Sequence, residues 1–214
     1  MNILLFGDSI TGYIPKDVLG FNWSYNFNKV DKNPREENYF VCGTENYTTD
    51  MLREYVYPHI DSSGYNTIIL QCGVNDFLRP RYDEDCKSKT PEEIATAIQE
   101  FVAVIKESSS AEVMLQSLYP IGKDYEAVIP NISRNIRFIN EELFQYCSDN
   151  GIFFIDMYSD LADEEGFLAE NYSDDGLHPN KEGYRIVVDK IKDSISFSTP
   201  LFDYSGFEEL NNGL

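Results

Sequence analysis

Basic residues and histidine are scarce in this chain of 214 residues. It carries 17 lysines and arginines against 37 aspartates and glutamates, and only 2 histidines. The formal net charge is therefore -20 at pH 7, and the isoelectric point is about 4.3. Such a charge repels phosphate groups, so nucleic acids and anionic membrane surfaces are poor partners. A high net charge also keeps proteins in solution, so it need not reflect binding to any partner. The charge therefore argues against polyanionic partners but does not identify a partner.

Cysteine and long apolar runs are scarce as well. The 4 cysteines lie far apart and form no C-x-x-C pair, which argues against a zinc cluster or a disulfide framework. No apolar run approaches the roughly 20 residues that a membrane-spanning helix needs. The first residues lack the basic stretch and the long apolar run of an export signal. We therefore expect a cytoplasmic protein without a membrane span.

Short apolar runs alternate with longer helical patterns along the chain. Because the runs are continuously apolar, they predict parallel strands that are buried on both faces. The predicted strands cover Asn2–Phe6, a short run at 38–43, Thr67–Cys72, Glu112–Leu118 and Ile152–Ile155.

Three helices are predicted between or after these strands. Thr90-Pro91-Glu92-Glu93 has the residues of a capping box and opens the first. The second ends at Asn150-Gly151, and the third follows Pro179. A fourth helix, over Thr48–His59, is a weaker prediction. The alternation indicates one α/β domain over residues 1–195, a three-layer α/β/α sandwich around a parallel sheet of about five strands. Residues 196–214 are expected to form a polar tail.

An aromatic segment interrupts this alternation. Phe21, Trp23, Tyr25 and Phe27 alternate with polar residues, which is the period of a strand with one aromatic face. The segment is either a half-buried strand that packs on the domain or an aromatic wall beside the functional site.

Polar residues gather at the predicted ends of the strands. In an open parallel sheet, ligands bind beyond the carboxyl ends of the strands. The groups that follow these ends are Gly7-Asp8-Ser9-Ile10, Gly43, Gly73-Val74-Asn75-Asp76 and Asp174-Asp175-Gly176-Leu177-His178.

These residue types fit acyl transfer. A serine hydroxyl such as that of Ser9 is a weak nucleophile until a base takes its proton, and neutral imidazole is the usual base. His178 is the candidate base, and Asp175, three residues earlier, can reach its ring within one turn. The other histidine, His59, follows Pro58 and is expected at the surface or at a helix end.

An ester-cleaving site also needs hydrogen-bond donors for the oxyanion that develops on the carbonyl. The backbone N–H groups of Ser9 and Gly43 and the side-chain amide of Asn75 could supply three. A glycine at 43 would let the backbone approach a bound carbonyl closely. Each motif alone is commonly a structural turn, but their occurrence in order at successive strand ends favours a catalytic site.

This set of residues resembles the SGNH, or GDSL-type, hydrolase superfamily of esterases and lipases. Four blocks carry the resemblance across residues 3 to about 188: Gly7-Asp8-Ser9-Ile10, Gly43, Gly73-x-Asn75-Asp76 and Asp175-x-x-His178. Ile10 replaces the leucine of the usual first block. The G-x-S-x-G motif of ordinary α/β-hydrolases is absent from the sequence.

The resemblance implies a flavodoxin-like fold and hydrolysis of esters or related acyl compounds. It makes Ser9 the nucleophile and His178 the base, with Asp175 as its partner and Asp174 as the alternative. Its oxyanion hole comprises Ser9, Gly43 and Asn75, with Asp8, Gly73 and Asp76 in supporting positions. It implies no metal and no organic cofactor.

The substrate is less well defined by the sequence. A small-molecule ester is expected, and an acetyl ester of a carbohydrate is preferred over lysophospholipids and thioesters. Phe21, Trp23, Tyr25 and Tyr39 could stack on sugar rings or line an acyl pocket. Arg79 and Arg81 could be solvated or could bind a substrate anion. The sequence does not indicate an oligomeric state.

Two alternatives from other classes remain at this point. A silent carbohydrate-binding or scaffold domain would have the same fold. An FMN-binding electron carrier would use Ser9-Ile10-Thr11-Gly12 as a phosphate loop, but Ile14 stands where that loop needs threonine.

Overall fold

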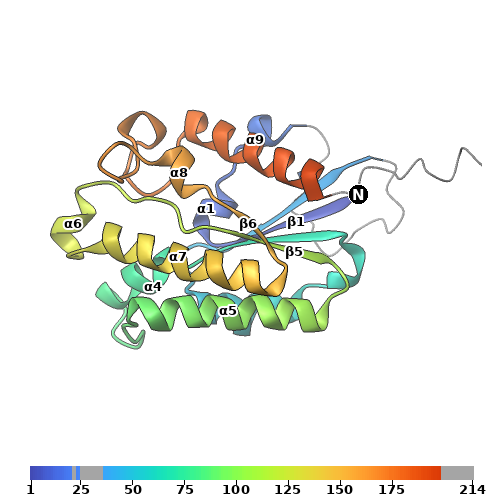
Figure 1. Ribbon diagram of the computed structural model, residues 1–214, viewed down its shortest axis with the longest axis horizontal. Coiled ribbons are helices and arrows are strands. Elements are labelled where there is room, and N and C mark those ends of the chain that lie inside the picture. The colour runs from blue at the N-terminus through green and yellow to red at the C-terminus, as the bar shows by residue number, and fades with distance from the viewer. Residues whose placement is uncertain (21–22, 25–35, 199–214) are drawn as a thin grey trace, which may run out of the picture.

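The fold is a sheet of parallel strands between two layers of helices (Figure 1). The computed structural model describes residues 1–20, 23–24 and 36–198. Within them the strand order is β2-β3-β1-β4-β5-β6, and every neighbouring pair is parallel. The strands are β1 (Asn2–Gly7), β2 (Trp23–Ser24), β3 (Asn38–Gly43), β4 (Thr67–Gln71), β5 (Glu112–Gln116) and β6 (Phe153–Ile155). The predicted α/β/α sandwich is confirmed, with β2 as a short addition to the five predicted strands.

The helices divide between the two faces of the sheet. They are α1 (Ser9–Gly12), α2 (Lys16–Leu19), α3 (Thr49–Met51), α4 (Val74–Leu78), α5 (Pro91–Ser108), α6 (Tyr125–Val128), α7 (Ile132–Asn150), α8 (Tyr158–Leu161) and α9 (Lys181–Ser198). In Figure 1, α5 and α7 lie side by side below the sheet, and α8 and α9 lie above it. The long helices α5, α7 and α9 correspond to the three predicted helices.

Local sequence signals account for the ends of the long helices. Thr90 and Glu93 form the complete capping box of α5, with each side chain bonded to the other's backbone N–H. Gly151, in the left-handed conformation, ends α7. The apolar face of α5 is buried on the sheet, where the ring of Phe101 meets Phe6 of β1 edge-on at 5.7 Å. The burial of these periodic apolar positions is what fixes each helix on its face.

The strand order has a switch point at β1. β1 is central, β3 lies on one side of it and β4 on the other. Without the short β2, this is the order of flavodoxin-like folds, in which ligands bind where the chain reverses direction across the sheet. The segments that leave β1, β3 and β4 therefore converge at one edge.

The predicted helix over Thr48–His59 is helical but not one α-helix. An α-turn at α3 continues as a π-helical turn over Leu52–Val56 and ends as a 3-10 turn over Tyr57–His59. Pro58 explains the change near the end, because it has no N–H for the bond that an α-helix requires. His59 is exposed, as expected. The helix α9 runs to Ser198, three residues beyond the predicted end of the domain.

Part of the predicted aromatic wall lies outside the described residues. Phe21, Tyr25 and Phe27 belong to that part, while Trp23 lies in β2. The structure supports neither of the two possibilities for Tyr39, which were stacking on a sugar ring and lining an acyl pocket. It is 4% exposed and lies near the amino end of β3, opposite the edge where the polar residues collect. Among the described residues, no helix is long and apolar enough to cross a membrane.

Candidate active site

The turn after β1 presents Ser9 at the first position of α1. Asp8 is the N-cap of this helix, and its carboxylate accepts a hydrogen bond from the Ile10 N–H at 3.0 Å. The other Asp8 oxygen faces the Gln71 amide at 3.5 Å. Complete burial of the Asp8 carboxyl raises its pKa to about 7. These contacts tie the turn to β4 and fix the position of Ser9.

A tightly bonded loop before α9 presents Asp175 and His178. Oδ1 of Asp175 accepts hydrogen bonds from the backbone N–H groups of Leu177 and His178, both at 2.8 Å. The Ser173 hydroxyl lies 2.7 Å from the His178 carbonyl oxygen and accepts a bond from the Gly176 N–H at 2.9 Å. The loop therefore holds Asp175 through its backbone and leaves the second carboxylate oxygen, Oδ2, for the imidazole.

The structure brings Ser9, His178 and Asp175 into one hydrogen-bonded chain, although 169 residues separate the serine from the histidine. Ser9 Oγ lies 2.9 Å from His178 Nε2, and His178 Nδ1 lies 2.7 Å from Asp175 Oδ2. Burial opposes the charge of Asp175, but the bonds from His178 and Leu177 outweigh it and lower the carboxyl pKa to about 2. Asp175 is thus an anion over the whole working range of pH and can stabilise an imidazolium. Asp174, the alternative partner, lines a hollow beside Asp175.

Asn75 lies at the start of α4, after β4. Gly73 precedes this helix with a φ of +119°, a backbone conformation that favours glycine. Asn75 is 3% exposed, and its side-chain amide donates one hydrogen bond to the Tyr47 carbonyl oxygen at 3.2 Å. A carboxamide has two N–H bonds, so the contact with Tyr47 orients the group and leaves one donor for a ligand.

Gly43 ends β3 beside the helix that carries Ser9. A Cβ at this position would lie 2.2 Å from the Gly12 backbone nitrogen and 2.7 Å from the Asp8 carbonyl oxygen. The sequence led us to expect that this glycine makes room for a bound carbonyl. The structure gives a different reason for it, which is the close packing of the α1 backbone against the end of β3.

Tyr13 is a residue at this site that the sequence motifs do not single out. Its ring lies 4.9 Å from the imidazole of His178, centroid to centroid, and the residue is 45% exposed. A hydrogen bond with the Glu45 carboxylate raises the pKa of the Tyr13 hydroxyl. Tyr13 follows Ser9 by four residues, which is the spacing of one helical turn and the only sequence signal for its place beside the site.

Arg79 could have been a solvated charge or an anion binder, and its contacts give it another role. Its guanidinium pairs with Asp83 at 2.8 Å and donates to the Asn46 carbonyl oxygen at 2.9 Å. Arg79 therefore joins the segments after β3 and β4 to each other. Arg81 is exposed.

Comparisons with known proteins identify the family and the fold of this chain. The sequence model of the GDSL-like lipase/acylhydrolase family matches residues 5–186. A search of curated proteins finds no match. Among solved structures, a GDSL-like lipase from Bacteroides thetaiotaomicron is 21% identical, with a TM-score of 0.70 over 92% of this chain and 88% of its own.

Two further solved structures share the fold at lower identity. An acetyl xylan esterase is 16% identical, with a TM-score of 0.64 over 91% of this chain and 100% of its own. A variant of an acetyl-xylooligosaccharide esterase from Geobacillus is 13% identical, with a TM-score of 0.66 over 92% of this chain and 95% of its own.

Proposed function

Because the chain belongs to the GDSL-like lipase/acylhydrolase family and is a hydrolase of ester bonds, we propose that it cleaves short-chain acyl esters through an acyl-enzyme on Ser9. The preferred substrate class is acetyl esters of carbohydrates. The observation that carries the proposal is the hydrogen-bonded chain from Ser9 through His178 to Asp175. A family match of this kind also argues against the silent binding domain and the FMN carrier. Ile14, where a phosphate loop needs threonine, is buried in the core.

The proposed cycle follows from the two hydrogen bonds of His178. Nε2 takes the proton of Ser9 as Oγ attacks the acyl carbonyl, and the Asp175 carboxylate stabilises the imidazolium. His178 then returns the proton to the leaving alcohol. Water, deprotonated by the same nitrogen, attacks the acyl-enzyme and releases the acid, which restores the Ser9 hydroxyl.

The oxyanion of both steps needs donors that are already in place. We assign this role to the backbone N–H groups of Ser9 and Gly43 and to the Asn75 amide. The Tyr47 carbonyl supports the assignment, because it holds the Asn75 amide in one orientation before substrate binds.

Replacing Asn75 by alanine is expected to lower kcat for p-nitrophenyl acetate by roughly 10²- to 10³-fold, with little change in KM. The reason is that the lost donor acts on the oxyanion and not on the ground-state ester. Steady-state kinetics measure the effect. The matched control is Asn38→Ala, because the Asn38 amide is bonded to Asn2 at the amino end of the sheet. A loss of only a few-fold in Asn75→Ala would remove Asn75 from the oxyanion hole.

The surroundings of Asp175 favour an uncharged substrate. A hollow of about 490 Å³ beside it is lined by six carboxylates, and by Lys123, which pairs with Glu165 at 2.6 Å. Coulomb repulsion would weaken binding of the phosphates of a lysophospholipid or of a coenzyme thioester there. The hydroxyl groups of a neutral sugar can donate to the same carboxylates. Two solved structures of this fold are named for esterases of acetylated xylan or xylooligosaccharides.

The acyl-chain preference of the wild-type enzyme tests the substrate class. We expect kcat/KM for p-nitrophenyl acetate to exceed that for the dodecanoate by about 10-fold or more, and acetate to be released from acetylated xylooligosaccharides. The assay is a series of p-nitrophenyl esters from acetyl to dodecanoyl, followed by measurement of free acetate. A preference for long chains would favour the alternative of a lysophospholipase or thioesterase. Failure to cleave any ester would contradict the proposal.

A further inference from the structure

Asp76 is a buried carboxylate next to Asn75 in α4. Its side chain is 0% exposed, and both of its carboxylate oxygens accept hydrogen bonds. Oδ2 accepts from the Thr49 N–H at 2.8 Å and from the Thr49 hydroxyl at 2.9 Å. Oδ1 accepts from Lys89 Nζ at 2.7 Å. Asp76 thus bonds both to the segment after β3 and to the segment that leads into α5.

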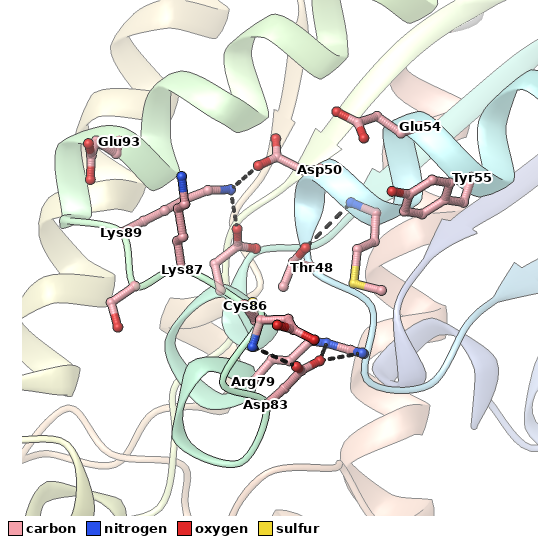
Figure 2. A pocket seen from close by; sticks show the side chains of 14 residues that line it. Thr48, Asp50, Glu54, Tyr55, Arg79, Asp83, Cys86, Lys87, Lys89 and Glu93 are labelled. Carbon is pink, nitrogen blue, oxygen red and sulfur yellow. Dashed lines mark hydrogen bonds and ion pairs between the residues drawn. The ribbon is translucent and has the colours of Figure 1, made fainter.

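Lys89 joins two carboxylates from different segments (Figure 2). Its ammonium pairs with Asp76 at 2.7 Å and with Asp50 at 2.6 Å, and its side chain is 20% exposed. Burial lowers the pKa of Lys89, but the two carboxylates outweigh burial and raise the pKa above its usual value. Lys89 is therefore a cation at any working pH. It immediately precedes Thr90, whose capping box anchors the backbone at the start of α5.

This network is adjacent to the proposed oxyanion donor along the chain. Asp76 follows Asn75 directly in α4, and Thr49 and Asp50 come shortly after Tyr47, whose carbonyl holds the Asn75 amide. Asp76 and Lys89 therefore connect the helix that carries the donor with the segment that orients it, and α5 anchors both. The network forms one wall of a hollow of about 940 Å³ that neither Ser9 nor His178 lines.

We infer that Lys89 is a positioning residue for the reaction: by bridging Asp76 and Asp50 it fixes the Asn75 amide for the oxyanion. This inference rests on the proposed function of Ser9 and Asn75. Lys89 does not touch the reacting atoms. It acts through the placement of α4 relative to the Tyr47 carbonyl, and a donor displaced from the oxyanion loses stabilisation that is realised only in the transition state.

The first test is Lys89→Met, which keeps the length of the side chain and removes its charge. We expect kcat for p-nitrophenyl acetate to fall by roughly 10-fold while KM changes less than about 2-fold, because a small displacement of a preorganised group costs rate and not ground-state binding. The matched control is Lys87→Met. Lys87 is exposed and lines the same hollow, two residues earlier (Figure 2). Its variant should keep the wild-type kcat.

A double-mutant cycle separates positioning from general loss of structure. In an Asn75→Ala background, Lys89→Met should change kcat by less than about 2-fold, because the amide through which Lys89 acts is absent. If Lys89 only stabilised the fold, Lys89→Met would lower kcat by the same factor in the wild type and in Asn75→Ala. That result, or a wild-type kcat in Lys89→Met, would overturn the inference.

Lys89→Met leaves the buried Asp76 carboxylate without its cation, and this variant could therefore fail to fold. A second variant keeps the inference testable in that case. Asp76→Asn/Lys89→Met removes both charges, and the asparagine oxygen can still accept from Thr49. The same cycle with Asn75→Ala applies to it. Ser9→Ala distinguishes a failure of the proposed function from a failure of the inference about Lys89. If it stays active, the proposed function fails. If it is inactive while the Lys89 variants match the wild type, only the inference fails.

Discussion

Alanine at position 9 is expected to lower kcat/KM for p-nitrophenyl acetate by roughly 10⁵-fold. Ser9 Oγ is the atom that bonds to the acyl carbon in the proposed cycle, and it lies 2.9 Å from the His178 nitrogen that would take its proton. Without Oγ, water must attack the bound ester directly, helped only by binding and by the oxyanion donors. The measurement is p-nitrophenol release at enzyme concentrations high enough to detect the residual rate.

The control for this variant is Ser194→Ala. Ser9 and Ser194 are both 6% exposed, so the two substitutions remove equally buried hydroxyl groups. The Ser194 hydroxyl donates to the Lys190 carbonyl oxygen within α9 and has no part in the proposed chemistry. It should keep the wild-type rate. Substantial turnover by Ser9→Ala, with a folded protein in both cases, would show that the nucleophile lies elsewhere.

Most of the fold could be predicted because its elements leave strong sequence patterns. The strands β1, β3, β4 and β5 are largely buried, and their continuous apolar runs make them predictable. The edge strand β6 is also a continuous apolar run, although Phe153 at its start is exposed. The long helices show an apolar period over four to five turns. Helices of four residues, such as α1 and α8, contain too few positions to show a period. The two-residue strand β2 is too short for the same reason.

The candidate site likewise has features that the sequence predicts and contacts that it does not. The motifs around Ser9, Asn75 and His178 are local, and the parallel sheet brings strand ends to one edge, so their meeting could be predicted. The contact that orients Asn75 could not, because the Tyr47 carbonyl belongs to the backbone and leaves no signal in the side-chain sequence. The packing of Gly43 against Gly12 depends on two elements that only the folded chain brings together.

The role of Lys89 could not be predicted from the sequence for another reason. It lies in a charge-rich segment between Asn75 and α5, where acidic and basic residues read as a solvated loop. Lys89 differs from the other charged residues of this segment because its ion-pair partner, Asp76, is buried. The burial of Asp76 depends on the segments after both β3 and β4, which the sequence of the loop does not show. Motifs thus identify the groups that we propose to react, whereas the groups that hold them in place emerge from the three-dimensional structure.

Replacing His178 by alanine is expected to lower kcat/KM by roughly 10⁵-fold, close to the effect of Ser9→Ala. In the proposed cycle both residues serve one proton transfer, so the variant Ser9→Ala/His178→Ala should be little worse than either single variant. The matched control is His59→Ala. His59 is the other of the 2 histidines in the chain, and it is exposed at the end of a 3-10 turn. It should retain wild-type kinetics.

The pH–rate profile of the wild type tests the same assignment without a substitution. A protonated imidazole cannot accept the Ser9 proton, so kcat/KM should fall as the pH is lowered from about 8 towards about 5. Asp175 cannot produce this fall, because its pKa of about 2 keeps it ionised throughout the range. Asp8, whose pKa burial raises to about 7, titrates in the same range, so a fall that persists in His178→Ala would belong to Asp8. The residual activity of His178→Ala should lack the fall. A wild-type profile that is flat from pH 5 to 8 would exclude His178 as the base, whatever its distance from Ser9.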